Sequence, residues 1–193
     1  MKTITRSRKS LRLPDWDYSQ PGAYFVTVIT RQRECLFGEI VNGKMKLNEA
    51  GQIVWDVWKS LPARYPYIAA DEAVVMPNHF HGIIIVKEYP PVSVTAAPVR
   101  AVHELPLQER LKERRRMTIP LVLGYFKMNS AKKINILLQS PGVPVWQRNY
   151  YERIIRESPV REIHEFPVQG IDQVRLYIRL NPERWLEDEE NKP

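Results

Sequence analysis

The sequence predicts an α+β domain in which an antiparallel sheet is flanked by helices. Short segments of β-branched and aromatic residues alternate with turn residues, and longer segments space their apolar residues as helices do. At 193 residues, 44% of them hydrophobic and 26% charged, the chain is long enough for one compact domain with its own core. Extended disorder, collagen and coiled coils are therefore excluded.

Four segments have the composition of strands between turn signals. They are residues 23–30, 38–47, 69–76 and 80–86. Residues 38–47 predict a hairpin, because Asn42-Gly43 is a favoured two-residue turn. Pro77-Asn78 separates the last two segments, which predicts adjacent antiparallel strands. Residues 145–147 and 150–156 are expected to add a further short strand.

Three longer segments predict helices, at residues 48–62, 119–138 and 173–181, with a shorter basic helix at 107–116. We expect Asn48 to cap the first of these helices and Asp172 to cap the last. Proline ends both, at Pro62 and Pro182, because the residue before a proline resists the helical conformation.

Charge divides the chain into a basic arm (1–20), a single domain (21–182) and an acidic tail (183–193). The tail carries five acids against two bases, a net charge of −3. Because the total net charge is +7, residues 1–182 carry +10. Within the domain we expect a proline-rich loop at 87–106 and an extended link at 157–171 before the last helix. The excess of positive charge points to a polyanionic partner.

Several protein classes are excluded by what the sequence lacks. The single Cys35 rules out internal disulfides and an all-cysteine zinc site. No apolar run approaches the roughly 18 residues that span a bilayer, and residues 1–13 have no signal-peptide core. We therefore expect a soluble cytoplasmic protein with no membrane partner, either a monomer or a homodimer.

Two of only four histidines stand in Asn78-His79-Phe80-His81-Gly82, at the start of a predicted strand. Because side chains alternate along a strand, His79 and His81 share one face. Two imidazoles side by side are a typical pair of ligands for a divalent metal. The alternative is that both are polar residues at a strand entrance, hydrogen-bonded to the backbone.

The last predicted helix carries Tyr177 and Asn181 four residues apart, hence on one helix face. An amide oxygen can ligate a hard cation, and the tyrosine lies beside an apolar edge that would hold its ring. Alternatively, Tyr177 is an ordinary tyrosine at the edge of the core and Asn181 an ordinary residue at the end of a helix.

Taken together, the motifs of this chain resemble those of the REP-associated tyrosine transposases and related single-tyrosine HUH transposases. The matching segments run in order along most of the chain, at residues 8–13, 17–27, 34–38, 75–82, 145–156 and 177–182. His79-Phe80-His81 matches the HUH motif, in which U is hydrophobic. Tyr177 matches the helix-borne nucleophile of that family, and Asn181 its third polar metal ligand.

The resemblance implies a ferredoxin-like HUH endonuclease domain acting on single-stranded or hairpin DNA. Tyr177 would attack a phosphodiester and form a 5′-phosphotyrosine link, with His79, His81 and Asn181 holding Mg²⁺ or Mn²⁺. The ligands alone would also accept zinc. No nucleotide cofactor is expected, because the link conserves bond energy and the chain has no Gly-x-x-x-x-Gly-Lys loop.

Basic and aromatic side chains are expected to contact the DNA backbone and bases. The candidates are Arg8, Arg12, Arg115, Lys127, Lys132, Arg148, Tyr150 and Arg153.

Tyr150 and Tyr151 are rival nucleophiles, but only Tyr177 has a polar ligand one helical turn on. The link at 157–171 is longer than in the family. Two other functions stay open: DNA binding without catalysis, and a metal phosphodiesterase acting on small nucleotides.

Overall fold

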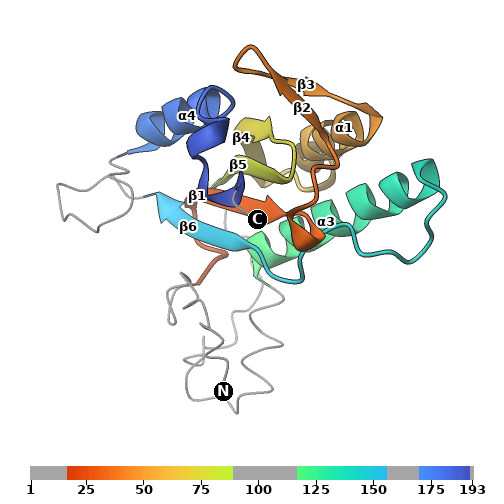
Figure 1. Cartoon of the computed structure of the whole chain (residues 1–193). Coiled ribbons are helices and arrows are strands. Elements are labelled where there is room, and N and C mark those ends of the chain that lie inside the picture. Colours follow the sequence, from red (N-terminus) through yellow and green to blue (C-terminus); the bar gives the residue numbers. More distant parts are fainter. Residues whose placement is uncertain (1–16, 89–116, 156–169, 192–193) are drawn as a thin grey trace, which may run out of the picture.

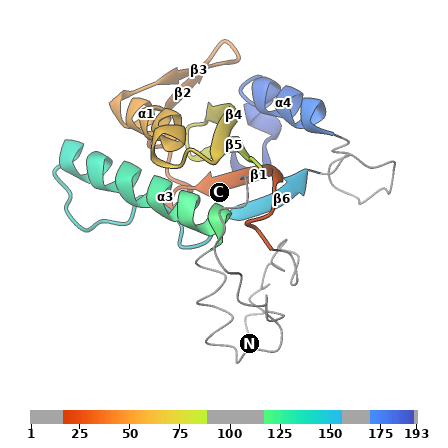
Figure 2. The same ribbon diagram turned by 180° about the vertical axis from the view of Figure 1, so that it is seen from behind.

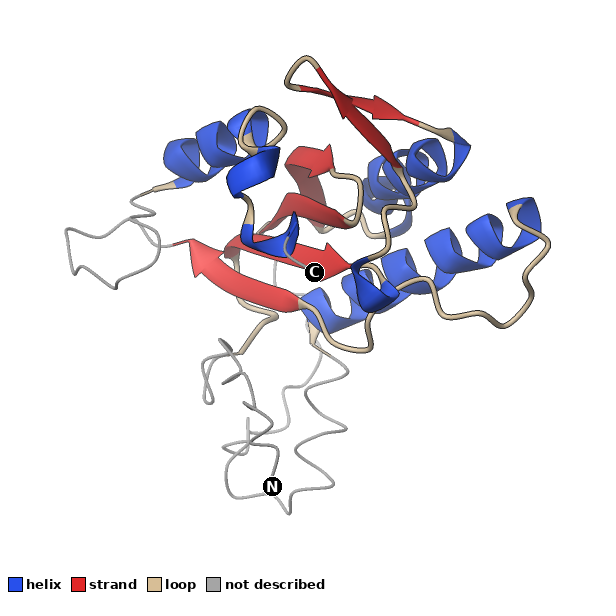
Figure 3. Cartoon of the chain, in the orientation of Figure 1, coloured by secondary structure: helices blue, strands red, loops and turns tan. Residues whose placement is uncertain are grey.

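The computed structural model describes residues 17–88, 117–155 and 170–191 (Figure 1). These residues form a four-stranded antiparallel sheet, a separate two-stranded hairpin and flanking helices (Figure 3). The predictions for the arm up to residue 16, the loop and basic helix between 89 and 116, and the link between 156 and 169 lie outside the described residues. In the described part, none of the helices combines the length and apolar character that crossing a bilayer requires.

The main sheet has the strand order β4-β5-β1-β6, with every neighbouring pair antiparallel. Its strands are β1 (Gly22–Ile29), β4 (Ile68–Val75), β5 (His79–Val86) and β6 (Tyr151–Ile155). The helices are α1 (Glu49–Arg64), α3 (Thr118–Leu137) and α4 (Ile171–Leu180). Along the chain, β1-α1-β4-β5-α3-β6 with this strand order is the ferredoxin-like topology, so the predicted fold class is confirmed.

Helices cover the two faces of the sheet unequally (Figure 1, Figure 2). On β5, the side chains of Phe80 and Ile84 pack into the large core beneath α1 and α3, whereas Ile83 packs with α4 on the other face. His79 and His81 have the same parity as Ile83, so they lie on the α4 face. Alternate side chains of β5 therefore lie in the core on the α1 and α3 face and in a polar site on the α4 face.

Local sequence signals explain how these elements begin and turn. The hairpin of β2 (Gly38–Val41) and β3 (Lys44–Leu47) turns at Asn42 and Gly43, whose φ angles of 51° and 71° require residues that tolerate the left-handed region. Asn48 caps α1 as predicted, its Oδ1 accepting from the backbone N–H of Gly51 at 2.9 Å.

Close approach explains Gly82 on β5. A Cβ there would lie 2.7 Å from the Trp58 ring of α1, so only glycine lets the helix pack this near. Trp58 also packs against Phe80, which lies between the two histidines on the strand, with ring centroids 4.7 Å apart.

Three sequence expectations were wrong in detail. Asp172 is not the N-cap of α4, because the helix already begins at Ile171 after Gly170 and Asp172 lies in its first turn. Helix α1 continues past Pro62 to Arg64: Pro62 cannot donate to the Trp58 carbonyl, but the chain stays helical and the Tyr65 backbone N–H still donates to the Leu61 carbonyl at 2.8 Å. Residues 145–147 form only a single bridge, between Trp146 and Thr30.

Candidate active site

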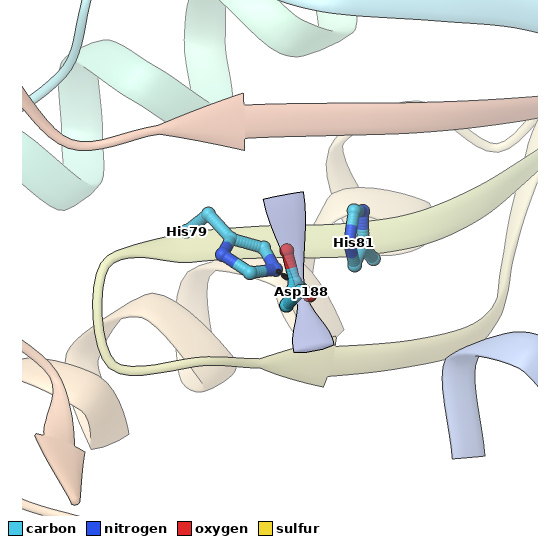
Figure 4. Close-up of side chains that lie close together, drawn as sticks. All are labelled: His79, His81 and Asp188. Carbon is cyan, nitrogen blue, oxygen red and sulfur yellow. Dashed lines mark ion pairs between the residues drawn. The ribbon is translucent and has the colours of Figure 1, made fainter. Parts of the chain in front are cut away.

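His79 and His81 stand side by side at the start of β5, with ring centroids 4.5 Å apart (Figure 4). The short turn at Pro77-Asn78 directly precedes them and connects β4 to β5. Its closing bond runs from the Met76 backbone N–H to the His79 carbonyl at 2.8 Å. Both imidazoles are buried, so their polar atoms depend on protein partners.

Asn78 fixes the tautomer of His79. The Nδ2 group of Asn78 donates to the backbone carbonyls of Glu190, at 2.7 Å, and Arg33, at 3.3 Å, which orients the amide. Its Oδ1 must then accept, so the His79 Nδ1–H donates to it at 2.8 Å. The lone pair of His79 therefore sits on Nε2 and faces the site.

Thr27 on β1 plays the corresponding part for His81. Its Oγ1 lies 2.8 Å from His81 Nδ1, and the two residues are directly paired across β1 and β5. With Nδ1 as donor to the hydroxyl, Nε2 of His81 also presents a lone pair.

Burial keeps both rings neutral near pH 7. It lowers the pKa of His79 to about 4, against opposing effects of Asp188 and Asn181, with Arg33 lowering the pKa further. Burial lowers the pKa of His81 well below its usual value, and the neighbouring His79 adds to this. Neutral imidazole is the form that binds metal ions.

The structure adds Asp188, a residue that the sequence did not suggest as a ligand. One ligand atom each from His79, His81 and Asp188 lies within 4.8 Å of the others, and Asp188 Oδ2 is 3.7 Å from His79 Nε2. The carboxylate arrives on short 3₁₀ turns, Trp185–Glu187 and Glu189–Asn191, that fold back from α4. Figure 4 shows it reaching toward both histidines.

Contacts with the rest of the site hold these turns in place. Arg33 pairs with Glu190 at 3.0 Å, and the Glu190 backbone N–H donates to Asp188 Oδ1 at 2.7 Å. The Trp185 ring lies 6.0 Å from that of His79. A tryptophan inside an otherwise acidic run was the available sequence signal that this segment packs against the domain.

The residues present fit a divalent cation. Among the described residues, four buried atoms at this site lack hydrogen-bond partners: His79 Nε2, His81 Nε2, Asn181 Oδ1 and Asp188 Oδ2. All four present lone pairs, and unpaired acceptors packed this closely are costly without a cation between them. Two imidazoles, an amide and a carboxylate suit a divalent ion.

Helix α4 brings Tyr177 to the same face. The Tyr177 ring centroid is 5.5 Å from that of His81 and 5.9 Å from that of Phe25, with edge contacts in both pairs. Asn181, buried at the end of α4, interacts with His79. The structure thus gathers four residues predicted from separate motifs: His79, His81, Tyr177 and Asn181.

Comparison with known proteins places the chain in a family. An uncharacterized protein of Haemophilus influenzae is 36% identical over 189 residues, covering 94% of this chain and 92% of that protein. The chain belongs to the family of that protein. No protein-family model matches the present chain.

Two solved structures are similar to the chain at low sequence identity. One is a REP-associated tyrosine transposase bound to a REP hairpin, with 18% identity, a TM-score of 0.43 and coverage of 86% of this chain and 69% of that one. The other is a candidate transposase from Deinococcus radiodurans, with 15% identity, a TM-score of 0.43 and coverage of 72% and 82%.

The predicted DNA contacts that the structure describes do not lie on one face. Arg153 is exposed on β6, paired with Phe25 and therefore on the α4 face, whereas Tyr150 packs against the opposite core. Lys127 Nζ donates to the backbone carbonyls of residues 147–149 and lies over the Tyr150 ring. Lys132 and Arg148 are exposed, and Arg8, Arg12 and Arg115 lie outside the described residues.

The rival tyrosines separate by strand parity. Tyr151 on β6 pairs with Thr27 on β1, so its side chain faces the same side of the sheet as His81. Strand β1 lies between Tyr151 and His81. Tyr150 precedes the strand and contacts the core beneath α3. Tyr177 has ring contact with His81 itself.

Proposed function

We propose that this chain is a divalent-cation-dependent DNA strand transferase that cleaves single-stranded or hairpin DNA with Tyr177 as its nucleophile. The observation that carries the proposal is the contact of the Tyr177 ring with His81, whose Nε2 is one of four buried acceptor atoms at the site that lack hydrogen-bond partners. A phenol, two neutral imidazoles and oxygen ligands on one sheet face suit attack on a phosphodiester. The motif resemblance to HUH transposases supports the same reaction.

Tyr177 is the attacking group in this account. Its oxygen forms a bond to phosphorus, the 3′ oxygen of the preceding nucleotide leaves, and the products are a 5′-phosphotyrosine link and a free 3′ hydroxyl. The phenol gives up its proton to solvent and the leaving oxygen takes one up, so protons balance. Attack by another 3′ hydroxyl on the link reverses the step and joins the strands.

His79, His81, Asn181 and Asp188 would hold the cation. When bound there, it supplies charge stabilisation for the phosphate oxygens. Asn78 and Thr27 keep both Nε2 lone pairs aimed at the site. Phe25 and His81 hold the Tyr177 ring, which limits the orientations of its hydroxyl.

The predicted partner is DNA, bound by the positive charge of the body. Arg153 lies exposed on the face that carries the site, where it can reach a phosphate. We propose that Lys132 and Arg148, exposed elsewhere, contribute to overall affinity, as do Arg8, Arg12 and Arg115. Affinity that comes from such contacts falls steeply with salt.

Covalent capture tests the proposal. A hairpin oligonucleotide labelled at its 3′ end is incubated with protein and Mn²⁺, and a labelled protein band is sought on a denaturing gel. The wild type is expected to form the band, and Tyr177→Phe and His81→Ala to lose it. Tyr151→Phe is the matched control, since it removes a hydroxyl from the same sheet face.

The outcomes separate the competing functions. A band that survives Tyr177→Phe contradicts the nucleophile assignment. Salt-sensitive binding of the hairpin with no band in any condition favours DNA binding without catalysis. Hydrolysis of a small chromogenic phosphodiester that Tyr177→Phe leaves unchanged favours a metal phosphodiesterase.

A further inference from the structure

Helix α4 carries Tyr177 on one flank of its buried stripe and two arginines on the other. Val174 and Ile178 are buried against the sheet. At 3.6 residues per turn, Arg175 and Arg179 fall on one side of that stripe and Tyr177 on the other. Any rotation of the helix about its axis that displaces the arginines therefore displaces the Tyr177 ring as well.

Arg175 makes a two-pronged contact with Asp71 of β4. Its Nε donates to Asp71 Oδ1 at 3.1 Å and its Nη2 to Oδ2 at 2.5 Å. The Asp71 side chain is only 17% exposed. The hydrogen bonds from Arg175 lower the pKa of Asp71, which keeps the carboxylate charged. Paired bonds of this kind fix orientation as well as distance.

Arg179, one helical turn on, repeats the contact with the next residue of β4. Its Nε and Nη2 lie 2.8 Å and 2.7 Å from Glu72 Oε2. In a regular strand, neighbouring residues such as Asp71 and Glu72 would point to opposite faces. The β4–β5 register shifts between Ala70 and Ala73, and this bulge lets both carboxylates reach α4.

We propose that Asp71 and Glu72 are positioning residues for the tyrosine. Through Arg175 and Arg179 they set the rotation of α4 on the sheet and so hold the Tyr177 ring against Phe25 and His81. Val174 and Ile178 are buried against the sheet, with Ile171 and Tyr177 partly buried beside them, and the two arginine contacts add a constraint on the opposite side of this stripe from Tyr177. The catalytic consequence rests on the proposed function, whereas the ring placement does not.

Asp172 provides a matched control. Its Oδ1 accepts from Nη1 of the same Arg175 at 2.8 Å, but it belongs to α4 itself and its side chain is 88% exposed. A contact within one helix cannot orient that helix on the sheet. The double variant, Asp71→Asn with Glu72→Gln, and the single variant Asp172→Asn both remove negative charge from this network. Only the double variant is expected to disturb the Tyr177 ring.

Two readouts test the proposal on the whole chain. The first is the nuclear Overhauser cross-peak between the rings of Tyr177 and Phe25, 5.9 Å apart between centroids, in protein with labelled aromatic residues. The second is the rate of covalent adduct formation at saturating hairpin DNA with Mn²⁺. We expect Asp71→Asn with Glu72→Gln to weaken the cross-peak and slow the adduct about 10- to 100-fold, a rate that at saturating DNA does not depend on hairpin affinity.

Asp172→Asn should leave both readouts at wild-type values. Arg175→Gln with Arg179→Gln, which breaks the same contacts from the helix, should reproduce the loss while the amide spectrum of β1 and β5 shows an intact sheet. Unchanged cross-peak and rate in both double variants would overturn the proposal, as would an equal loss in Asp172→Asn. If no protein forms an adduct but the cross-peaks respond as expected, the proposed function fails and the positioning of the ring stands.

Discussion

The two faces of the sheet show how one strand serves two purposes. Toward α1 and α3, β5 presents Phe80 and Ile84 to a continuous apolar core that includes Trp58 and Phe126. Toward α4, the same strand presents His79 and His81, and among the described residues the apolar cluster there has three buried members, Ile83, Val174 and Ile178. Buried polar groups are tolerated on the second face because the first supplies the free energy of folding.

Removing a core side chain tests the first face and has the largest expected effect. Phe80 packs 4.7 Å from Trp58 and 4.9 Å from Phe126 between ring centroids. Phe80→Ala should lower the free energy of unfolding by about 3–5 kcal/mol, through lost burial and the cavity left behind. Urea denaturation measures it.

The neighbouring His81→Ala is the control on the other face. It removes a smaller buried ring and one hydrogen bond, but also a buried Nε2 without a partner, so it should cost less than Phe80→Ala. Equal losses for Phe80→Ala and His81→Ala would contradict the division between the faces.

Acid should lower the free energy of unfolding of the metal-free protein, because His79 and His81 on the α4 face are buried in their neutral form. The folded-state pKa of His79 is lowered to about 4 and that of His81 well below 6.5. Between these values and 6.5 the unfolded chain binds more protons, so stability is full above pH 6.5 and falls as pH drops toward 4. For His79 alone the loss is on the order of 3 kcal/mol.

Urea denaturation at pH 7.5 and pH 4.5 measures this loss. His79→Gln with His81→Gln removes both titrating groups, so the double variant should show a smaller drop than the wild type over the same interval. Identical drops in the two proteins would show that the histidines do not titrate as their burial requires.

Cation binding should stabilise the wild type and leave that double histidine variant unaffected. At a Mn²⁺ concentration of 100 times Kd, the free energy of unfolding should rise by about 2.7 kcal/mol, provided that only the folded state binds the ion. Thermal unfolding with and without Mn²⁺ gives the shift. The same rise in the double variant would place the ion elsewhere.

A smaller effect is expected from Thr27→Val, which keeps the shape of a buried residue and removes the partner of His81 Nδ1. Loss of this orienting contact should weaken Mn²⁺ binding about 10- to 100-fold. Ser130→Ala is the control on the other face, since it removes a buried hydroxyl that accepts from Trp146 Nε1 at 2.9 Å. Calorimetric titration should show weaker binding only for Thr27→Val.

Local signals in the sequence predicted most of the fold. The Asn42-Gly43 turn, the Asn48 cap and the two strands around Pro77-Asn78 depend on neighbouring residues alone, and all three are confirmed. The pairing of His79 and His81 on one face follows from strand alternation. Asp172 misled because a residue suited to capping stands one position inside a helix that starts earlier.

The rest of the site depends on contacts between distant segments. Asp188 lies in an acidic run that looks like a solvated tail, and contacts with distant residues, the Trp185 ring beside His79 and the Arg33–Glu190 pair, bring it to the histidines. The faces of Tyr150 and Tyr151 depend on where β6 begins, which a short strand does not reveal. The bulge that aims two carboxylates at α4 likewise follows from strand register.

Peptide mapping of the covalent product tests the central claim most directly. Wild-type protein is incubated with hairpin DNA and Mn²⁺, digested with nuclease and protease, and analysed by mass spectrometry for a tyrosine carrying a nucleotide phosphate. We predict that the modification lies on the peptide containing Tyr177 and requires His79 and His81. Modification on the peptide containing Tyr150 and Tyr151, or DNA binding with no modified tyrosine, would contradict the account.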